Sequence, residues 1–147
     1  MPLPMPLLPA WTRWAGVALV AATIFVFSVL RAPPEPVVTV GPLRLDQWRP
    51  LLAYAGLGTA VAYATVDWRG GTWSVAVAVV LVAALYGVGI ELLQGLLPGR
   101  YLSVGDMLAN AVGALGATPM ALARHRIEWL SLERCVRRLR GPPDTEP

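Results

Sequence analysis

The residues of this chain that could do chemistry gather in one stretch, residues 86–117. Five polar side chains interrupt an otherwise apolar sequence there: Glu91, Gln94, Arg100, Asp106 and Asn110. The two carboxyl groups could give or take a proton, and the guanidinium could bind a phosphate or carboxylate through two parallel hydrogen bonds. Each ionisable side chain placed in hydrocarbon costs roughly 2.5–3.5 kcal/mol on insertion scales. Their retention therefore predicts a use, in binding, in chemistry or in holding helices together.

The spacing of these residues predicts one shared site. Glu91 and Gln94 are three residues apart, and Asp106 and Asn110 are four apart, so each pair shares a helix face. Residues 97–102 form a short link whose proline and glycine favour a tight turn. A short link forces two antiparallel helices, which brings all five polar side chains to one end of the pair.

The composition predicts a membrane protein of one domain. Of the 147 residues, 56% are hydrophobic and only 14% are charged, and the mean hydropathy is +0.57. A soluble domain carries about a quarter charged residues. The single cysteine, Cys135, excludes an internal disulfide and a cysteine metal cluster. The net charge of +3 comes from arginines at the ends of apolar runs, so we expect membrane lipids and no nucleic acid as partners.

The elements that must position the polar residues are four apolar spans, expected over residues 14–30, 51–66, 73–97 and 104–123. We therefore predict an all-α, integral membrane four-helix bundle with a C-terminal amphipathic surface helix. The expected divisions are an N-terminal tail at 1–13, the transmembrane domain at 14–123 and a cytoplasmic basic tail at 124–147. A signal peptide is the alternative for the first span, but Arg31 disfavours a clean cleavage site.

Two of the expected spans carry small residues at every fourth position, which allows helices to approach closely. They are Gly56, Ala60 and Ala64 in one span, and Ala109, Gly113 and Ala117 in the other. A homodimer through these stripes is an open prediction.

The ends of the chain differ in character. Four prolines in residues 1–9 argue against a helix there. Residues 124–140 predict a basic amphipathic helix on an anionic membrane surface, with a nucleic-acid or protein partner as the alternative. The tryptophans fall beside the expected span ends, as in an aromatic belt: Trp11, Trp14, Trp48, Trp68, Trp73 and Trp129.

The arginines predict the orientation. If both termini are cytoplasmic, that side carries eight arginines and the other side four. The excess on one side favours this orientation. The polar stretch, together with Asp46 at the start of the second span, then faces outward.

The polar stretch resembles the VanZ-like family. The matching residues are Glu91 and Gln94, the Pro98-Gly99-Arg100 turn, Asp106, Asn110, Gly113 and Gly116. A fainter match joins Asp46 to Tyr54-Ala55-Gly56-Leu57, where members often carry Asp-Lys-x-x-His before the tyrosine. This chain has Gln47 and Pro50 at the lysine and histidine positions, so no role that needs those two residues is carried over. The resemblance covers about residues 46–117 and implies a link to resistance against the glycopeptide antibiotic teicoplanin.

Three hypotheses follow for the polar residues, and the sequence leaves open whether the protein is an enzyme. The first is an outer-face site that binds or modifies a lipid-linked envelope precursor or a glycopeptide; its candidate residues are Asp46, Glu91, Gln94, Arg100, Asp106 and Asn110. The second is a binding protein without catalysis, because no nucleophile with a matching base is present. The third is a cluster that only fixes helix packing. No cofactor is expected, and no spacing motif supports a metal site of Asp46, Glu91 and Asp106.

Overall fold

The computed structural model of the protein describes residues 3–30, 39–40, 43–98 and 104–139, and within these the side chains of residues 3–4, 39–40, 43–47 and 138–139 are not described. The described chain is mostly helical. Its elements in order are β1 (Leu3–Leu7), α1 (Ala10–Phe25), η1 (Val26–Leu30), β2 (Thr39–Val40), β3 (Leu43–Arg44), α2 (Leu45–Ala64), α3 (Thr72–Gly95), α4 (Val104–Leu115), α5 (Thr118–Ala123), β4 (Ile127–Ser131) and α6 (Leu132–Leu139).

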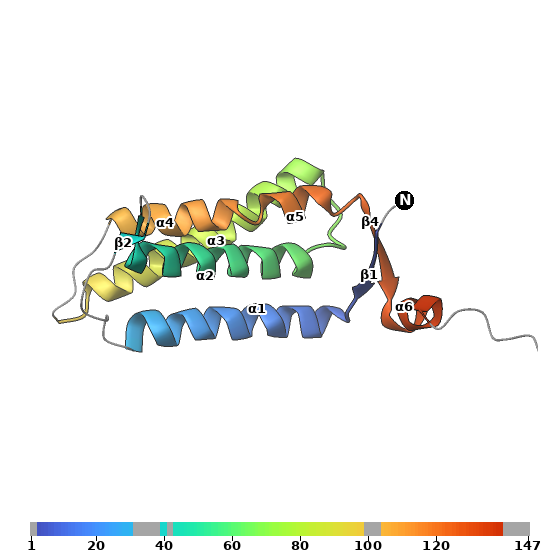
Figure 1. Ribbon diagram of the computed structural model, residues 1–147, viewed down its shortest axis with the longest axis horizontal. Helices are drawn as coiled ribbons and strands as arrows, with labels where there is room; N and C mark the ends of the chain where they lie inside the picture. The colour runs from blue at the N-terminus through green and yellow to red at the C-terminus, as the bar shows by residue number, and fades with distance from the viewer. Residues whose placement is uncertain (1–2, 31–38, 41–42, 99–103, 140–147) are drawn as a thin grey trace, which may run out of the picture.

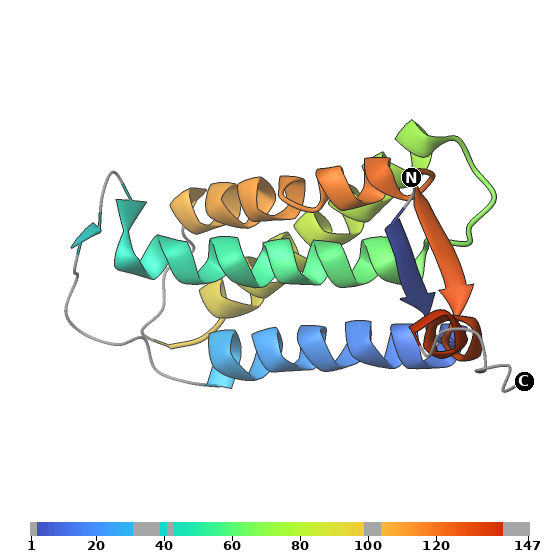
Figure 2. The same cartoon turned by 45° about the vertical axis from the view of Figure 1, so that its right-hand side comes forward.

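Helix α2 lies at the centre of the arrangement. It contacts α1 on one side and α4 on the other, and α3 packs against both α2 and α4 (Figure 1). Helices α4 and α5 follow one another along α2, as both views show (Figure 2). The buried apolar side chains between these helices include Leu57, Val61, Val79 and Ile90. The short turn after Asp67 makes α2 and α3 antiparallel neighbours.

Two stretches are long and apolar enough to cross a membrane. One is Ala10–Leu30, where α1 continues into the π-helical η1, and the other is α3, with mean hydropathies of 1.9 and 2.4. By length and composition they match the first and third expected spans, although the first helix begins earlier than predicted. Helix α2 also begins earlier than the expected span, and Pro50 lies inside it.

The prediction of one continuous helix over residues 104–123 is wrong. Helix α4 ends at Leu115 and α5 begins at Thr118. The cause is Pro119, whose ring would collide with the carbonyl of Leu115 four residues earlier and which has no N–H to donate. The amides of Gly116 and Ala117 instead bond three residues back, to Gly113 and Ala114.

Close approach of α2 and α4 depends on glycine. A Cβ on Gly113 would collide with the carbonyl oxygen of Leu51, and one on Gly58 would lie 2.7 Å from the Cβ of Ala117. The small-residue stripe of the fourth expected span is therefore a packing surface. The stripe predicted in the second span is wrong at Gly56, which is exposed and has no atom within 4 Å of its Cβ position. The close contact of α2 comes from Gly58 instead.

The two ends of the chain pair with one another. Strand β1 runs parallel to β4, with Met5 opposite Trp129 (Figures 1 and 2). Residues 3–9 of the proline-rich N-terminal segment contain no helix, as the prolines predict. The helix expected over residues 124–140 is wrong in its first half, because residues 127–131 form β4 and only α6 is helical. Pairing with β1 supplies backbone hydrogen bonds that a local sequence pattern does not reveal.

Candidate functional site

Three buried polar side chains from three different helices meet toward one end of the molecule. Tyr54 of α2, Glu91 of α3 and Asn110 of α4 are exposed by 2%, 5% and 2% respectively. Tyr54 and Asn110 both lie against Gly87, four residues before Glu91 on α3: a Cβ there would lie 2.9 Å from the Cβ of Asn110 and 3.1 Å from a ring carbon of Tyr54. We call Tyr54, Glu91 and Asn110 the polar cluster.

Hydrogen-bonding capacity remains unused in the polar cluster. Within the described part of the chain, the hydroxyl of Tyr54 and the Oδ1 of Asn110 are buried without a hydrogen-bond partner. Leaving a buried polar group unsatisfied costs about 1–3 kcal/mol. The carboxyl group of Glu91 is close enough to the Tyr54 hydroxyl for an electrostatic interaction between them. A hydroxyl, a carboxyl group and an amide oxygen together can receive a ligand group that donates hydrogen bonds.

Two other polar side chains of α3 connect it to the first apolar stretch. The amide of Gln94 donates to the carbonyl of Ser28 at 2.7 Å, and the hydroxyl of Tyr86 donates to the carbonyl of Ala21 at 2.7 Å. Gln94 therefore lies on the same helix as Glu91 but is engaged in a helix–helix contact. Its hydrogen bond satisfies a backbone carbonyl and ties η1 to α3.

The remaining predicted site residues are placed only in part. Asp106 is half-buried in the first turn of α4, where a negative charge is favoured by the helix dipole. Asp46 lies in the first turn of α2, which starts at the same end of the molecule as α4 (Figure 1). Its side chain and the whole of Arg100 lie outside the described part. The residues that the structure brings together are thus Glu91 and Asn110, joined by Tyr54.

Tyr54 was absent from the predicted site, although its motif was noted. The signal that could have found it is its place in the Tyr54-Ala55-Gly56-Leu57 match, since a tyrosine hydroxyl within an apolar helix needs a partner. The described residues contain no group of three or more His, Cys, Asp or Glu that could hold a metal ion. The expectation that there is no metal site of Asp46, Glu91 and Asp106 stays a prediction, because the Asp46 side chain lies outside the described part.

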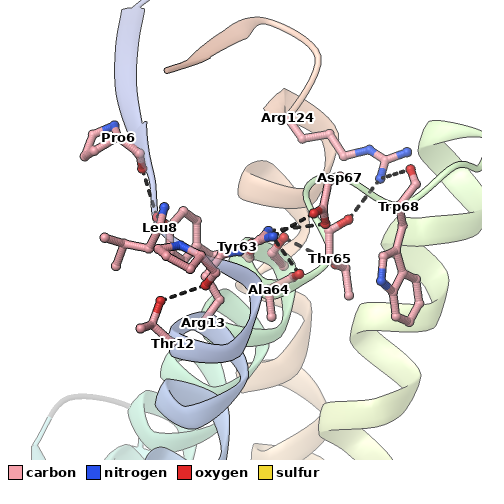
Figure 3. A network of polar contacts seen from close by, with 12 residues as sticks. Pro6, Leu8, Thr12, Arg13, Tyr63, Ala64, Thr65, Asp67, Trp68 and Arg124 are labelled. Carbon is pink, nitrogen blue, oxygen red and sulfur yellow. Dashed lines mark hydrogen bonds and ion pairs between the residues drawn. The ribbon is translucent and has the colours of Figure 1, made fainter. Parts of the chain in front are cut away.

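A second polar network at the opposite end is built on Arg13. This arginine is 4% exposed and donates to the carbonyls of Tyr63 and Ala64, both at 3.2 Å, in the last turn of α2 (Figure 3). It also forms an ion pair with Asp67, with 2.6 Å between Nη2 and Oδ2. The last carbonyls of a helix have no intrahelical partner and favour a cation. The hydrogen bonds that Arg13 donates to the Asp67 carboxylate are the main reason why the pKa of Asp67 lies below its usual value near 3.8.

Arg124 completes this network from the other side. It is 3% exposed and donates to the carbonyls of Thr65, Trp68 and Gly70, the last at 2.7 Å. Its own carbonyl accepts a hydrogen bond from the indole of Trp129 at 2.8 Å. The sequence places Arg124 at the start of the basic tail, and the structure buries its side chain. A cation next to a neighbouring helix's C-terminus is not recognisable before the helices are packed.

The hydroxyl of Tyr63 fastens the first strand to the same end. It accepts from the amide of Leu8 at 3.0 Å and donates to the carbonyl of Pro6 at 2.9 Å. Its ring lies 5.7 Å from the ring of Trp129 in β4. We call the paired strands β1 and β4, with Arg13, Tyr63 and Arg124, the terminal clasp.

A mostly helical chain with two membrane-length apolar helices and a buried polar cluster has the features of a small helical membrane protein. The sequence profile of the VanZ/LLP1 family matches residues 17–123, which is most of the chain. The protein belongs to the VanZ/LLP1 family, which confirms the resemblance seen at its polar residues. Comparisons with curated proteins and with solved structures gave no significant match.

Proposed function

We propose that this protein crosses the membrane four times and binds the polar part of an envelope ligand at the polar cluster. The observation that carries the proposal is the pair of buried, unsatisfied atoms, the hydroxyl of Tyr54 and Oδ1 of Asn110. A ligand that supplies the missing hydrogen bonds removes the free-energy cost of leaving these buried atoms unpaired. This relief adds to the affinity for the ligand. Membership of the VanZ/LLP1 family supports the membrane setting.

Four crossings are supported by the lengths and the arrangement of the helices. Helices α1 with η1 and α3 are long enough individually. Helix α2 has 20 residues and lies between α1 and α4. The α4–α5 pair runs along α2 for most of its length, so the break at Pro119 divides the fourth crossing without redirecting it (Figure 2).

The ligand class follows from the chemistry of the candidate residues. Tyr54, Glu91 and Asn110 offer mainly acceptors and suit hydroxyl or amino groups of a ligand. Arg100, in the link between α3 and α4, suits a phosphate or carboxylate. Both kinds of group occur in lipid-linked envelope precursors and in glycopeptides. The arginine distribution favours cytoplasmic termini, which puts this site on the outer face of the plasma membrane.

The competing function is a non-catalytic role in helix packing. Gln94 supports it, because this side chain uses its amide to hold η1 against α3. The two proposals differ in what the polar cluster contributes to stability. A packing cluster stabilises the fold, whereas a ligand site that lacks its ligand contributes little or even destabilises it.

The test is the thermal stability of the purified protein and its variants, measured with and without a ligand probe. The variants are Glu91→Gln, Arg100→Ala and Asp106→Asn, and the control is Thr59→Ala, which removes an exposed hydroxyl bonded only to its own helix. The probes are a polyprenyl diphosphate and teicoplanin. We expect the site variants to melt within a few degrees of the parent and to lose the stabilisation that a probe gives to the parent and to the control. Site variants that melt far below Thr59→Ala would show that the polar groups hold the helices together, and the ligand site would be rejected.

A further inference from the structure

We propose that α6 rests on anionic lipid headgroups at the membrane face where α1 begins, and that the terminal clasp fixes it there. This inference depends on the membrane-spanning part of the proposed function but not on the ligand site. It concerns the end of the molecule opposite the polar cluster (Figure 1).

The side chains of α6 are divided between two faces. Leu132 and Val136 are four residues apart and exposed by 53% and 38%. Arg134 and Arg137 are three residues apart, are exposed, and lie on the other side of the helix. A short helix with exposed apolar residues on one side and arginines on the other suits the boundary between hydrocarbon and headgroups.

Exposed tryptophans mark the level of that boundary at the same end. Trp11 in the first turn of α1 is 72% exposed, and Trp73 in the first turn of α3 is 71% exposed. Tryptophan is enriched where the bilayer meets water. Since α6 packs on β1, and β1 leads directly into α1, α6 is held near this level.

The clasp limits where α6 can go. The strand before it, β4, is paired along its whole length with β1, and β1 is bound to α2 through Tyr63. Helix α6 follows Ser131 without a linker. The backbone hydrogen bonds between β1 and β4 therefore hold α6 in place, and α6 is not attached through a flexible linker.

The charge around α6 favours an anionic partner for its surface. The exposed charged residues of segment 126–137 are Arg126, Arg134 and Arg137 against Glu133, which leaves a positive excess. Arginine near an anionic leaflet gains about 1 kcal/mol, equivalent to a roughly fivefold bias toward the surface. The exposed apolar pair Leu132 and Val136 favours a lipid leaflet over a purely polar anionic partner.

The experiment uses Cys135, which is the only cysteine of the chain and lies within α6. The full chain, labelled there with an environment-sensitive fluorophore, is placed in nanodiscs of phosphatidylcholine alone or mixed with phosphatidylglycerol. Quenching by neutral acrylamide measures how much water reaches the label. We expect several-fold weaker quenching with phosphatidylglycerol, and high salt should restore it because surface charge is screened.

The matched variants separate α6 from general charge effects. Arg134→Gln combined with Arg137→Gln should abolish the lipid dependence, whereas Arg69→Gln, an exposed arginine of the α2–α3 turn, should keep it. Equal quenching in both lipids, or equal loss in the Arg69 control, would overturn the proposal. Protection that rises with the number of chains per nanodisc would assign the surface to a second copy instead. Failure of the chain to enter nanodiscs would reject the membrane-spanning model itself.

Discussion

The two polar regions of this protein differ in how many of their buried polar atoms have partners. In the terminal clasp, Arg13 and Arg124 are almost fully buried, and their guanidinium groups donate to carbonyls at the end of α2 and in the turn after it, and to Asp67. Within the described residues, Nε of Arg13 is the one buried side-chain atom of these two arginines without a partner. In the polar cluster, Tyr54 and Asn110 are equally buried, yet each keeps an atom without a partner in the described part of the chain. Satisfied polar groups stabilise one fold, and unsatisfied ones persist where something other than folding uses them. The comparison therefore separates a structural end from a candidate ligand end.

The largest effect should come from removing a clasp arginine. Arg13→Ala leaves two carbonyls and Asp67 without their donor, and we expect it to lower the free energy of unfolding by about 2–4 kcal/mol. Denaturant titration in detergent measures this change. Arg69→Ala removes an exposed arginine and should change stability by no more than about 0.5 kcal/mol. Equal effects in the two variants would mean that the clasp network is not what stabilises this end.

A glycine pair tests whether packing, rather than polar contacts, brings the helices together near the cluster. Gly113→Ala forces a methyl group against the backbone of Leu51 and should cost about 1–3 kcal/mol. Gly56→Ala enters open space on α2 and should gain up to about 1 kcal/mol from helix propensity. Thermal melting of both proteins gives the sign of each change. A stable Gly113 variant would contradict the close approach of α2 and α4.

The same chemical change at each end gives the sharpest comparison. Tyr63→Phe removes a hydroxyl that makes two hydrogen bonds and should cost about 1 kcal/mol. Tyr54→Phe removes an unsatisfied hydroxyl and should be neutral or raise stability by up to about 1 kcal/mol. Parallel unfolding measurements on ligand-free protein test both. A destabilised Tyr54 variant would show that this hydroxyl has a structural partner, and the contrast between the two ends would disappear.

The smallest effect should be a pH dependence of the clasp. The pKa of Asp67 is lowered in the folded state, so its contribution is present above its usual value near 3.8 and is lost as the pH falls through the folded pKa. Because Asp67 is half-exposed, we expect at most about 1 kcal/mol. Between about pH 5 and pH 2 the parent should therefore lose slightly more stability than Asp67→Asn. Parallel curves for the two proteins would show that the ion pair contributes nothing.

Much of the architecture was predictable because it depends on local composition. Long apolar runs predict α1 and α3, and the turn after Asp67 predicts their antiparallel neighbour α2. The spacing of Glu91 and Asn110 within the hairpin of α3 and α4 predicts that both reach the same region, and both are buried there. The break in the last span could have been predicted from Pro119, but an assignment based on hydropathy alone gives one continuous helix.

The rest required tertiary contacts. Strand β4 exists because β1 is available to pair with it, although the two are more than a hundred residues apart in the chain. Gly58 rather than Gly56 faces α4, which depends on how α2 is rotated in the assembly. Asp46 and Arg100 stay predicted site residues, since the described part of the structure does not include their side chains.

By itself, the sequence determined the family, the helical character and the stretch in which polar residues interrupt apolar spans, because each depends on residue types at short spacing. Only the tertiary structure decided which polar groups have partners. Arg13 and Arg124 become structural because the carbonyls at the C-terminal end of α2 and in the turn after it lie beside them. Tyr54 joins Asn110 because Gly87 leaves room for three helices to meet, and no residue in the described part satisfies what they leave open. Hydrogen-bond satisfaction is a property of the packed chain, and it distinguishes the clasp from the polar cluster.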